Sequence, residues 1–82
     1  MTKIKVFEVF EVSSKVFFEI KVEEGKYLIG DIYEDLVSNL KFQITGIGMD
    51  NIINSKTDSV LVKNLTDNLP LSEFKNKIFY KV

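Results

Sequence analysis

Cysteine, histidine, arginine, tryptophan and alanine are all absent from this chain of 82 residues. The absence of cysteine excludes disulfides, zinc–thiolate sites and thiol nucleophiles. Without histidine, general acid–base chemistry is left to carboxylates, lysines and the three tyrosines. Arginine is the preferred bidentate reader of phosphate and guanine, so its absence argues against strong, autonomous nucleic-acid binding.

The chain also lacks an excess of either charge, and it lacks long apolar runs. The 11 lysines nearly balance the 12 acidic residues, which gives a net charge of −1 and leaves room only for a local lysine patch. No apolar run approaches the roughly 20 residues that span a bilayer. The N-terminal MTKIKVFEVF lacks the uninterrupted apolar core and the small-residue cleavage site of a signal peptide. We therefore expect a soluble, cytoplasmic domain over residues 1–82, with neither DNA nor a membrane as partner.

The residues that are present favour strands. Nine Ile, nine Val, seven Phe, three Tyr and four Thr occur, while alanine, the best helix former, is missing. Glycine and polar turn residues recur every 8–12 positions, a spacing typical of small sandwiches and barrels. The composition predicts an all-β fold.

Residues 15–23 form the clearest single pattern in the chain. Four apolar side chains alternate with a mainly charged set, as in a half-buried strand. The apolar set is Val16, Phe18, Ile20 and Val22, and the other set is Lys15, Phe17, Glu19, Lys21 and Glu23. The polar, glycine-bearing residues 23–26 then predict a hairpin turn, with residues 27–29 starting the return strand.

The remaining strands are predicted over residues 3–12, 32–36, 40–45, 60–65 and 78–82. In the first of these the alternation slips by one position, which predicts a β-bulge at Phe7 and Glu8, and the pair Ser13-Ser14 predicts a short turn after it. Gly46 and Gly48 predict a further bulge or tight bend. One helical turn is predicted from Pro70 to Phe74, with the proline at its first position. Together these signals predict a small closed or partly open antiparallel β-barrel of about six strands.

The order of the signals resembles the second domain of elongation factor Tu and of related translational GTPases. The resemblance covers nearly the whole chain and rests on the runs VFEVSSKVFFEIKVEEGKYLIGD, FQITGIGM, VLVKNL and NKIFYKV. Its most typical features are the glycine turn after Val22, the pair Gly30-Asp31, and the strand that runs from Thr45 to Met49. The resemblance implies a translation-type β-barrel.

The departures from that family bear on function. The glycine-rich, arginine-containing loop of the family is shortened here to Ser13, Ser14 and Lys15, and Gly48 stands where an acidic residue is frequent. No glycine-rich Lys-Ser/Thr phosphate loop occurs, so the resemblance implies the barrel without GTP hydrolysis.

Candidate sites are few. Phe17, between Lys15 and Lys21, is suited to stack on a base, although cover by a neighbouring loop is the favoured interpretation. Asp31, Glu34 and Asp35 match no calcium loop and are best explained as a solvated turn. The pair Ile52-Ile53 forms either a partner contact or a lid on the barrel, with the lid favoured. No serine has a histidine partner, so neither catalysis nor a cofactor or metal is expected.

Two functional hypotheses follow. The first is a non-catalytic interaction module that docks onto a protein or a ribonucleoprotein and binds with little salt dependence. The second is a weak RNA- or tRNA-binding module that uses the face of Lys15, Phe17 and Lys21 and loses affinity steeply with salt. The balanced charge and the absence of arginine favour the first.

Overall fold

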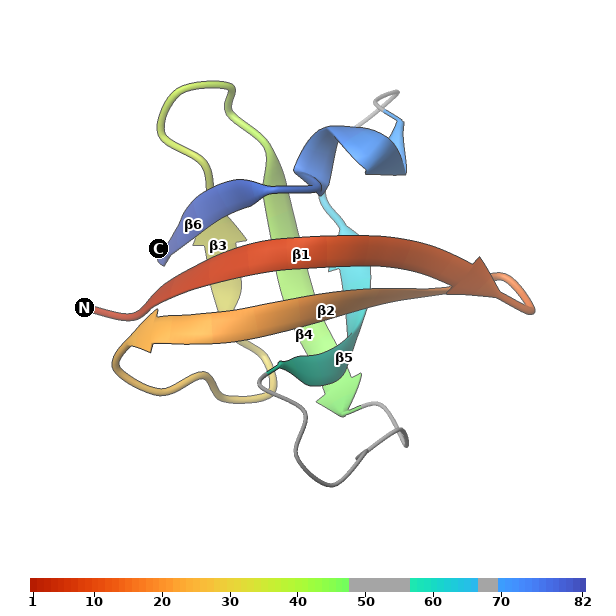
Figure 1. Cartoon of the computed structure of the whole chain (residues 1–82), viewed down its shortest axis with the longest axis horizontal. Coiled ribbons are helices and arrows are strands. Elements are labelled where there is room, and N and C mark those ends of the chain that lie inside the picture. Colours follow the sequence, from red (N-terminus) through yellow and green to blue (C-terminus); the bar gives the residue numbers. More distant parts are fainter. Residues whose placement is uncertain (48–56, 67–69) are drawn as a thin grey trace.

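Six antiparallel strands close into a barrel in the computed structural model, which describes residues 1–47, 57–66 and 70–82 (Figure 1). The elements are β1 (Lys3–Val12), β2 (Lys15–Glu24), β3 (Ile32–Glu34), β4 (Lys41–Ile47), β5 (Asp58–Asn64), the 3₁₀ turn η1 (Leu71–Phe74) and β6 (Lys77–Lys81). Around the barrel the order is β1-β2-β5-β4-β3-β6, so β6 closes the sheet onto β1. The predicted all-β barrel and its single helical turn are confirmed. Pro70 differs slightly from expectation, because its extended backbone caps η1 instead of forming its first residue.

The core lies inside the barrel and is mainly aromatic. Phe42 is at its centre, with ring centroids 4.8 Å from Phe18 and 5.0 Å from Phe79. Phe74 of η1 is fully buried, and its ring contacts those of Phe18, Phe42 and Phe79. On β2 the side chains of Phe18 and Ile20 are fully buried, so the predicted alternation is confirmed.

Register shifts interrupt the described sheet between Lys3 and Ile4, near Phe7 and on β4. Val6 pairs with Ile20 while Glu8 pairs with Glu19, so Phe7 is the extra residue that the sequence placed here. The register shift on β4, between Ile44 and Gly46, confirms the bulge predicted at the first glycine. Gly48 lies outside the described residues.

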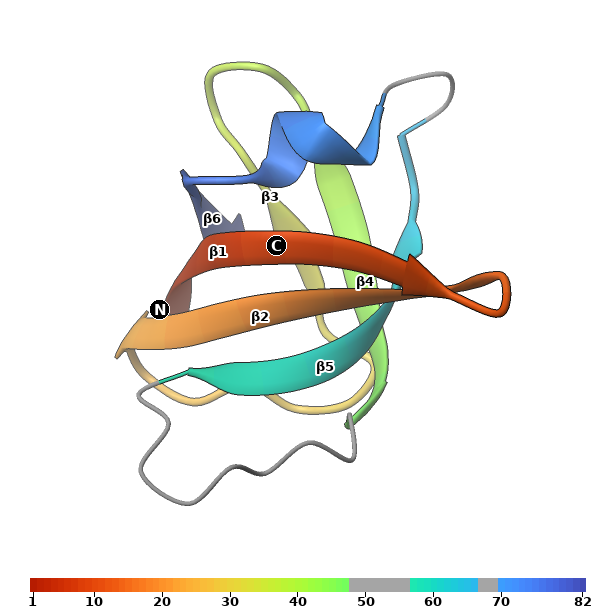
Figure 2. The same ribbon diagram turned by 45° about the vertical axis from the view of Figure 1, so that its right-hand side comes forward.

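The β1–β2 hairpin is the longest feature of the fold. Its turn consists of Ser13 and Ser14, both with positive φ (51° and 67°), which matches a two-residue turn between antiparallel strands. β6 pairs with β1 only as far as Val6, and β5 pairs with β2 only from Val16 to Ile20. The end of the hairpin therefore extends past the body of the barrel (Figures 1 and 2).

The prediction of a hairpin after β2 is wrong. Residues 27–29 form no strand, and the neighbours of β2 are β1 and β5, which fill both of its edges. The chain crosses instead to the opposite side of the barrel, where β3 pairs with β4 and β6. Asp31 shapes the connection, since its Oδ2 accepts a hydrogen bond from the N–H of Leu28 at 2.8 Å.

Candidate binding surfaces

Lys15, Phe17 and Lys21 all point outward from β2, as their alternation predicted. Lys15 and Lys21 are exposed, and Phe17 is half-buried. At about 3.3 Å per strand residue, the six-residue separation puts the two lysine Cα atoms about 20 Å apart. Lys15 and Phe17 therefore belong to one surface and Lys21 to another.

Phe17 belongs to a row of apolar side chains that crosses three strands on the outside of the barrel and ends at Gly46 of β4. Its direct partners are Phe10 on β1 and Leu61 on β5, and Leu61 in turn lies opposite Gly46 on β4. The rings of Phe10 and Phe17 stack with centroids 5.7 Å apart and planes inclined by 15°. Some of the cover over Phe17 thus comes from Phe10 on the neighbouring strand.

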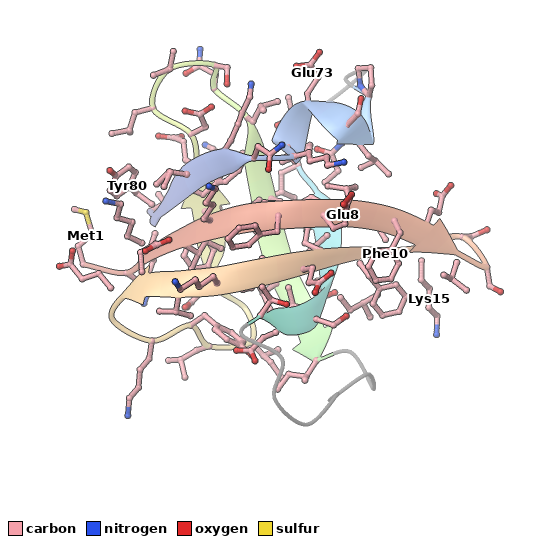
Figure 3. The ribbon with its side chains drawn as sticks, in the orientation of Figure 1. Met1, Glu8, Phe10, Lys15, Glu73 and Tyr80 are labelled. Carbon is pink, nitrogen blue, oxygen red and sulfur yellow. The ribbon has the colours of Figure 1, made fainter. Side chains whose placement is uncertain are left out.

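This surface is exposed at the hairpin end. Phe10 keeps 37% of its accessible surface and Val12, two residues further on, keeps 54%. Figure 3 shows Phe10 and Lys15 together at this end of the hairpin. We call the surface made by Phe10, Val12, Phe17 and Leu61 the hairpin face.

Lys21 lies among other lysines. It pairs directly with Lys5, and the neighbour of Lys5 on β6 is Ile78. Lys5 Nζ lies 5.0 Å from the ring centroid of Phe7, within cation–π range. Among the described residues no ion pair involves Lys21, Lys5 or Lys3. We call these three lysines the basic face.

An acidic pair separates the two surfaces. Glu8 and Glu19 lie opposite each other on β1 and β2. Glu8 forms an ion pair with Lys75 at 3.0 Å, and Glu19 accepts a hydrogen bond from the hydroxyl of Thr57. From Phe17 to Lys21 the outward side chains of β2 therefore change from aromatic to acidic to basic.

The acidic residues 31, 34 and 35 are engaged separately. Asp31 forms an ion pair with Lys81 at 3.5 Å, and Glu34 forms one with Lys41 at 3.2 Å. In the described parts of the chain, no three acidic side chains are grouped to hold a metal ion. The expected solvated turn is therefore wrong, because Asp35 is buried, the Asp31 side chain is only 10% exposed and Glu34 lies on β3.

Asp35 organises the loop between β3 and β4. Its carboxylate accepts hydrogen bonds from the Ser38 hydroxyl and from the N–H of Val37. Burial alone raises its pKa, but the hydrogen bonds from Ser38 and Val37 and the charge of Lys77 outweigh burial and hold the pKa below its usual value. The loop borders an open hollow of about 510 Å³ on the outside of β6, lined by Asp35, Leu36, Val37, Ser38, Lys77, Ile78 and Tyr80.

Sequence reasoning missed Phe10 as a site residue, although the signal was present. A two-residue turn at Ser13-Ser14 pairs Val12 with Lys15 and therefore Phe10 with Phe17. The register follows from the turn alone. Ile52 and Ile53, the other apolar candidates, lie outside the described residues.

Comparison with protein-family models, with curated proteins and with solved structures finds no match. Within the described residues no helix is long and apolar enough to cross a membrane.

Proposed function

We propose that this chain is a non-catalytic interaction module, a translation-type barrel that docks onto a protein or a ribonucleoprotein partner through the hairpin face. The observation that carries the proposal is the stacked pair of Phe10 and Phe17, which lies on the outside of a barrel that already has a complete aromatic core. A cytoplasmic location is part of the same proposal, and fractionation of cells that produce the tagged chain tests it.

Physical arguments support a protein partner. Aromatic side chains are enriched at the centres of protein interfaces, because they bury a large area at a small cost in conformational entropy. Phe10 and Val12 keep much of their surface in the isolated chain, so a partner gains by covering them. The flanking Glu8 and Lys15 supply the mixed polar rim that such surfaces carry.

The elongation factor Tu resemblance also supports the proposal. Its glycine turn follows β2, its Gly30-Asp31 pair stands before β3, and its Thr-Gly feature falls at the bulge of β4. These positions are compatible with the strand order of the barrel. Since the family resemblance is to a docking domain without a phosphate loop, it points to binding and not to catalysis.

The test is affinity capture from a lysate of the source cells with quantitative mass spectrometry. The immobilised wild type is compared with Phe10→Ser and with Leu28→Ser, which alters an apolar side chain that is 64% exposed outside the hairpin face. We expect a defined protein to be captured by the wild type and by the Leu28 variant, and to be lost with the Phe10 variant. Equal capture by all three would contradict a role for the hairpin face.

Weak RNA binding remains the second candidate, and the pairing of Lys5 with Lys21 favours it. Two adjacent cations with no ionic partner among the described residues can hold a phosphate. Phe7 provides a ring beside Lys5, and Tyr80 provides one beside Lys3. Fluorescence anisotropy with single-stranded RNA and with tRNA, at low and then moderate salt, separates the two candidates. RNA binding predicts steep salt dependence and weaker binding for Lys5→Gln and Lys21→Gln, with Lys26→Gln as control and Phe17→Ala testing the hairpin face.

A further inference from the structure

The outer half of β1 has an edge that no described strand pairs with, although η1 packs against β1 (Figures 1 and 2). β1 pairs with β6 from Lys3 to Val6, and its residues 8–12 pair only with β2 among the described strands. The side of residues 8–12 that faces away from β2 accepts no hydrogen bond from any other described backbone group. Unpaired edges of this kind are places where another strand adds to a sheet.

The turn determines which backbone groups are free. In a hairpin with a two-residue turn, the closing pair, here Val12 and Lys15, is hydrogen-bonded across the two strands. Hydrogen-bonded and non-hydrogen-bonded residue pairs then alternate along the hairpin, so the backbone groups of Phe10 form hydrogen bonds with those of Phe17. The N–H and C=O groups of Val9 and Glu11 therefore point away from β2, toward the unpaired edge.

We propose that two copies of this chain associate by antiparallel pairing of these edges, around a two-fold axis at Phe10. In this register Val9 exchanges backbone hydrogen bonds with Glu11 of the partner subunit, and Glu11 exchanges them with Val9 of the partner subunit. Phe10 lies opposite the partner's Phe10 as a non-hydrogen-bonded pair, in which side chains approach most closely. Because the contact is isologous, it closes at a dimer.

Other symmetric registers are less favourable. A two-fold axis at Glu11 would put two carboxylates directly opposite each other, which destabilises a strand pair. An axis at Val9 would extend the pairing to Phe7, where the strand is bulged. That register would also pair Val12 with Val6 of the partner subunit, where the edge is occupied, because the N–H of Asn76 bonds to the carbonyl of Val6 at 2.7 Å.

The side chains argue for a second copy as the occupant. The axis at Phe10 aligns four rings in one row, Phe17 and Phe10 of each subunit, and so continues the stack that the single chain already contains. Glu8 lies opposite Val12 of the partner subunit, next to the partner's Lys15, and Glu11 lies opposite Val9 of the partner subunit. No like charges meet across the contact. A strand from another protein has no such built-in match.

The experiment uses the wild type and single-cysteine variants, since the natural chain has no cysteine. Sedimentation velocity over a concentration series should show a monomer–dimer equilibrium for the wild type. Phe10→Cys should form an intermolecular disulfide under mild oxidation in buffer but not in urea. Val12→Cys, exposed on the same face, should not, because four residues of offset put the two introduced sulfurs far beyond disulfide range.

A second pair of variants distinguishes the contribution of the backbone edge to association from that of the Glu11 side chain. Glu11→Pro removes an N–H that β2 does not use, and proline is tolerated on edge strands, so the barrel should stay folded by circular dichroism. We expect it to weaken association at least about tenfold, whereas Glu11→Ala, which keeps the N–H, should associate at least as well as the wild type. The proposal would be overturned if the wild type stayed monomeric up to about 1 mM. It would also be overturned if the chain stayed monomeric because the β1 edge binds a strand of another protein in place of a second copy. Phe10→Cys and Val12→Cys variants that cross-link equally would overturn it too, as would a Glu11→Pro variant that associates normally.

Discussion

Lys5 and Lys21 lie directly opposite each other on β1 and β2, with like charges on neighbouring strands. Such pairs destabilise a sheet, and the described residues provide neither lysine with an ionic partner. The nearest compensation in the structure is the ring of Phe7 beside Lys5. The barrel thus retains an electrostatic cost on its outer surface.

Removal of one of these charges should stabilise the barrel. We expect Lys21→Gln to raise the free energy of unfolding by about 0.2–1 kcal/mol at low ionic strength. The gain should shrink in concentrated salt, which screens exposed charges. Urea denaturation at two salt concentrations measures both effects. Lys26→Gln, at an exposed lysine beyond the end of β2, is the control and should change little.

The centre of the core should be the most sensitive position to lost volume. Phe42 is fully buried and contacts the rings of Phe18, Tyr33, Phe74 and Phe79. We expect Phe42→Leu to lower the free energy of unfolding by about 1–2 kcal/mol, because it removes ring contacts without emptying the site. Val37→Ala, at a side chain that is 92% exposed, should stay within about 0.5 kcal/mol of the wild type in the same urea titration.

Two glycines with positive φ provide a matched pair. Gly25 (φ +79°) has the hydroxyl oxygen of Thr2 only 2.9 Å from where a Cβ would lie, whereas Gly30 (φ +99°) has nothing within 4 Å. Gly30→Ala should therefore cost only the left-handed backbone strain, about 1–2 kcal/mol. Gly25→Ala should cost more, because Thr2 is buried and its hydroxyl bonds to the carbonyl of Lys26. Thermal melts of the two variants, side by side, decide this, and equal costs would exclude the clash.

Asp35 should make the free energy of unfolding depend on pH in the acidic range. Its pKa is lower in the folded chain than its usual value near 3.8, so the unfolded chain binds the proton first. Its contribution is therefore complete above about pH 4–5 and is lost as pH falls through 3.8 toward the folded value. Asp35→Asn should be less stable than the wild type at pH 6, and the difference should narrow by pH 3. A difference that stays constant over this range would show that the charge plays no part.

The sequence was sufficient to predict features that are determined within a single strand. The alternation of Phe18 and Ile20 with charged residues predicted which face of β2 is buried, and the phase slip in β1 located the bulge at Phe7. Both are properties of a few consecutive residues. The basic and hairpin faces are different, because each combines side chains from strands that are distant in sequence.

The wrong prediction of a hairpin after β2 also arose because the outcome depends on a strand that is distant in the sequence. Residues 23–26 have the composition of a hairpin turn, and Tyr27, Leu28 and Ile29 look like a strand. Whether a return strand forms there depends on whether the edge of β2 is free, and β5, more than 30 residues later, takes it. The shared strand face predicts that Lys21 and Phe17 belong to one surface, but Glu19 and its partner Glu8 lie between them.

The closure of β6 onto both β1 and β3 also determines when the chain can fold during synthesis. Until Lys77–Lys81 has left the ribosome, β1 and β3 each lack a neighbour, and their edges stay open for longer than those of any other strand pair. Pairings between such distant segments make folding slow, on a scale of milliseconds to seconds for β-barrels. The barrel can therefore close only after residues 77–81 have left the ribosome.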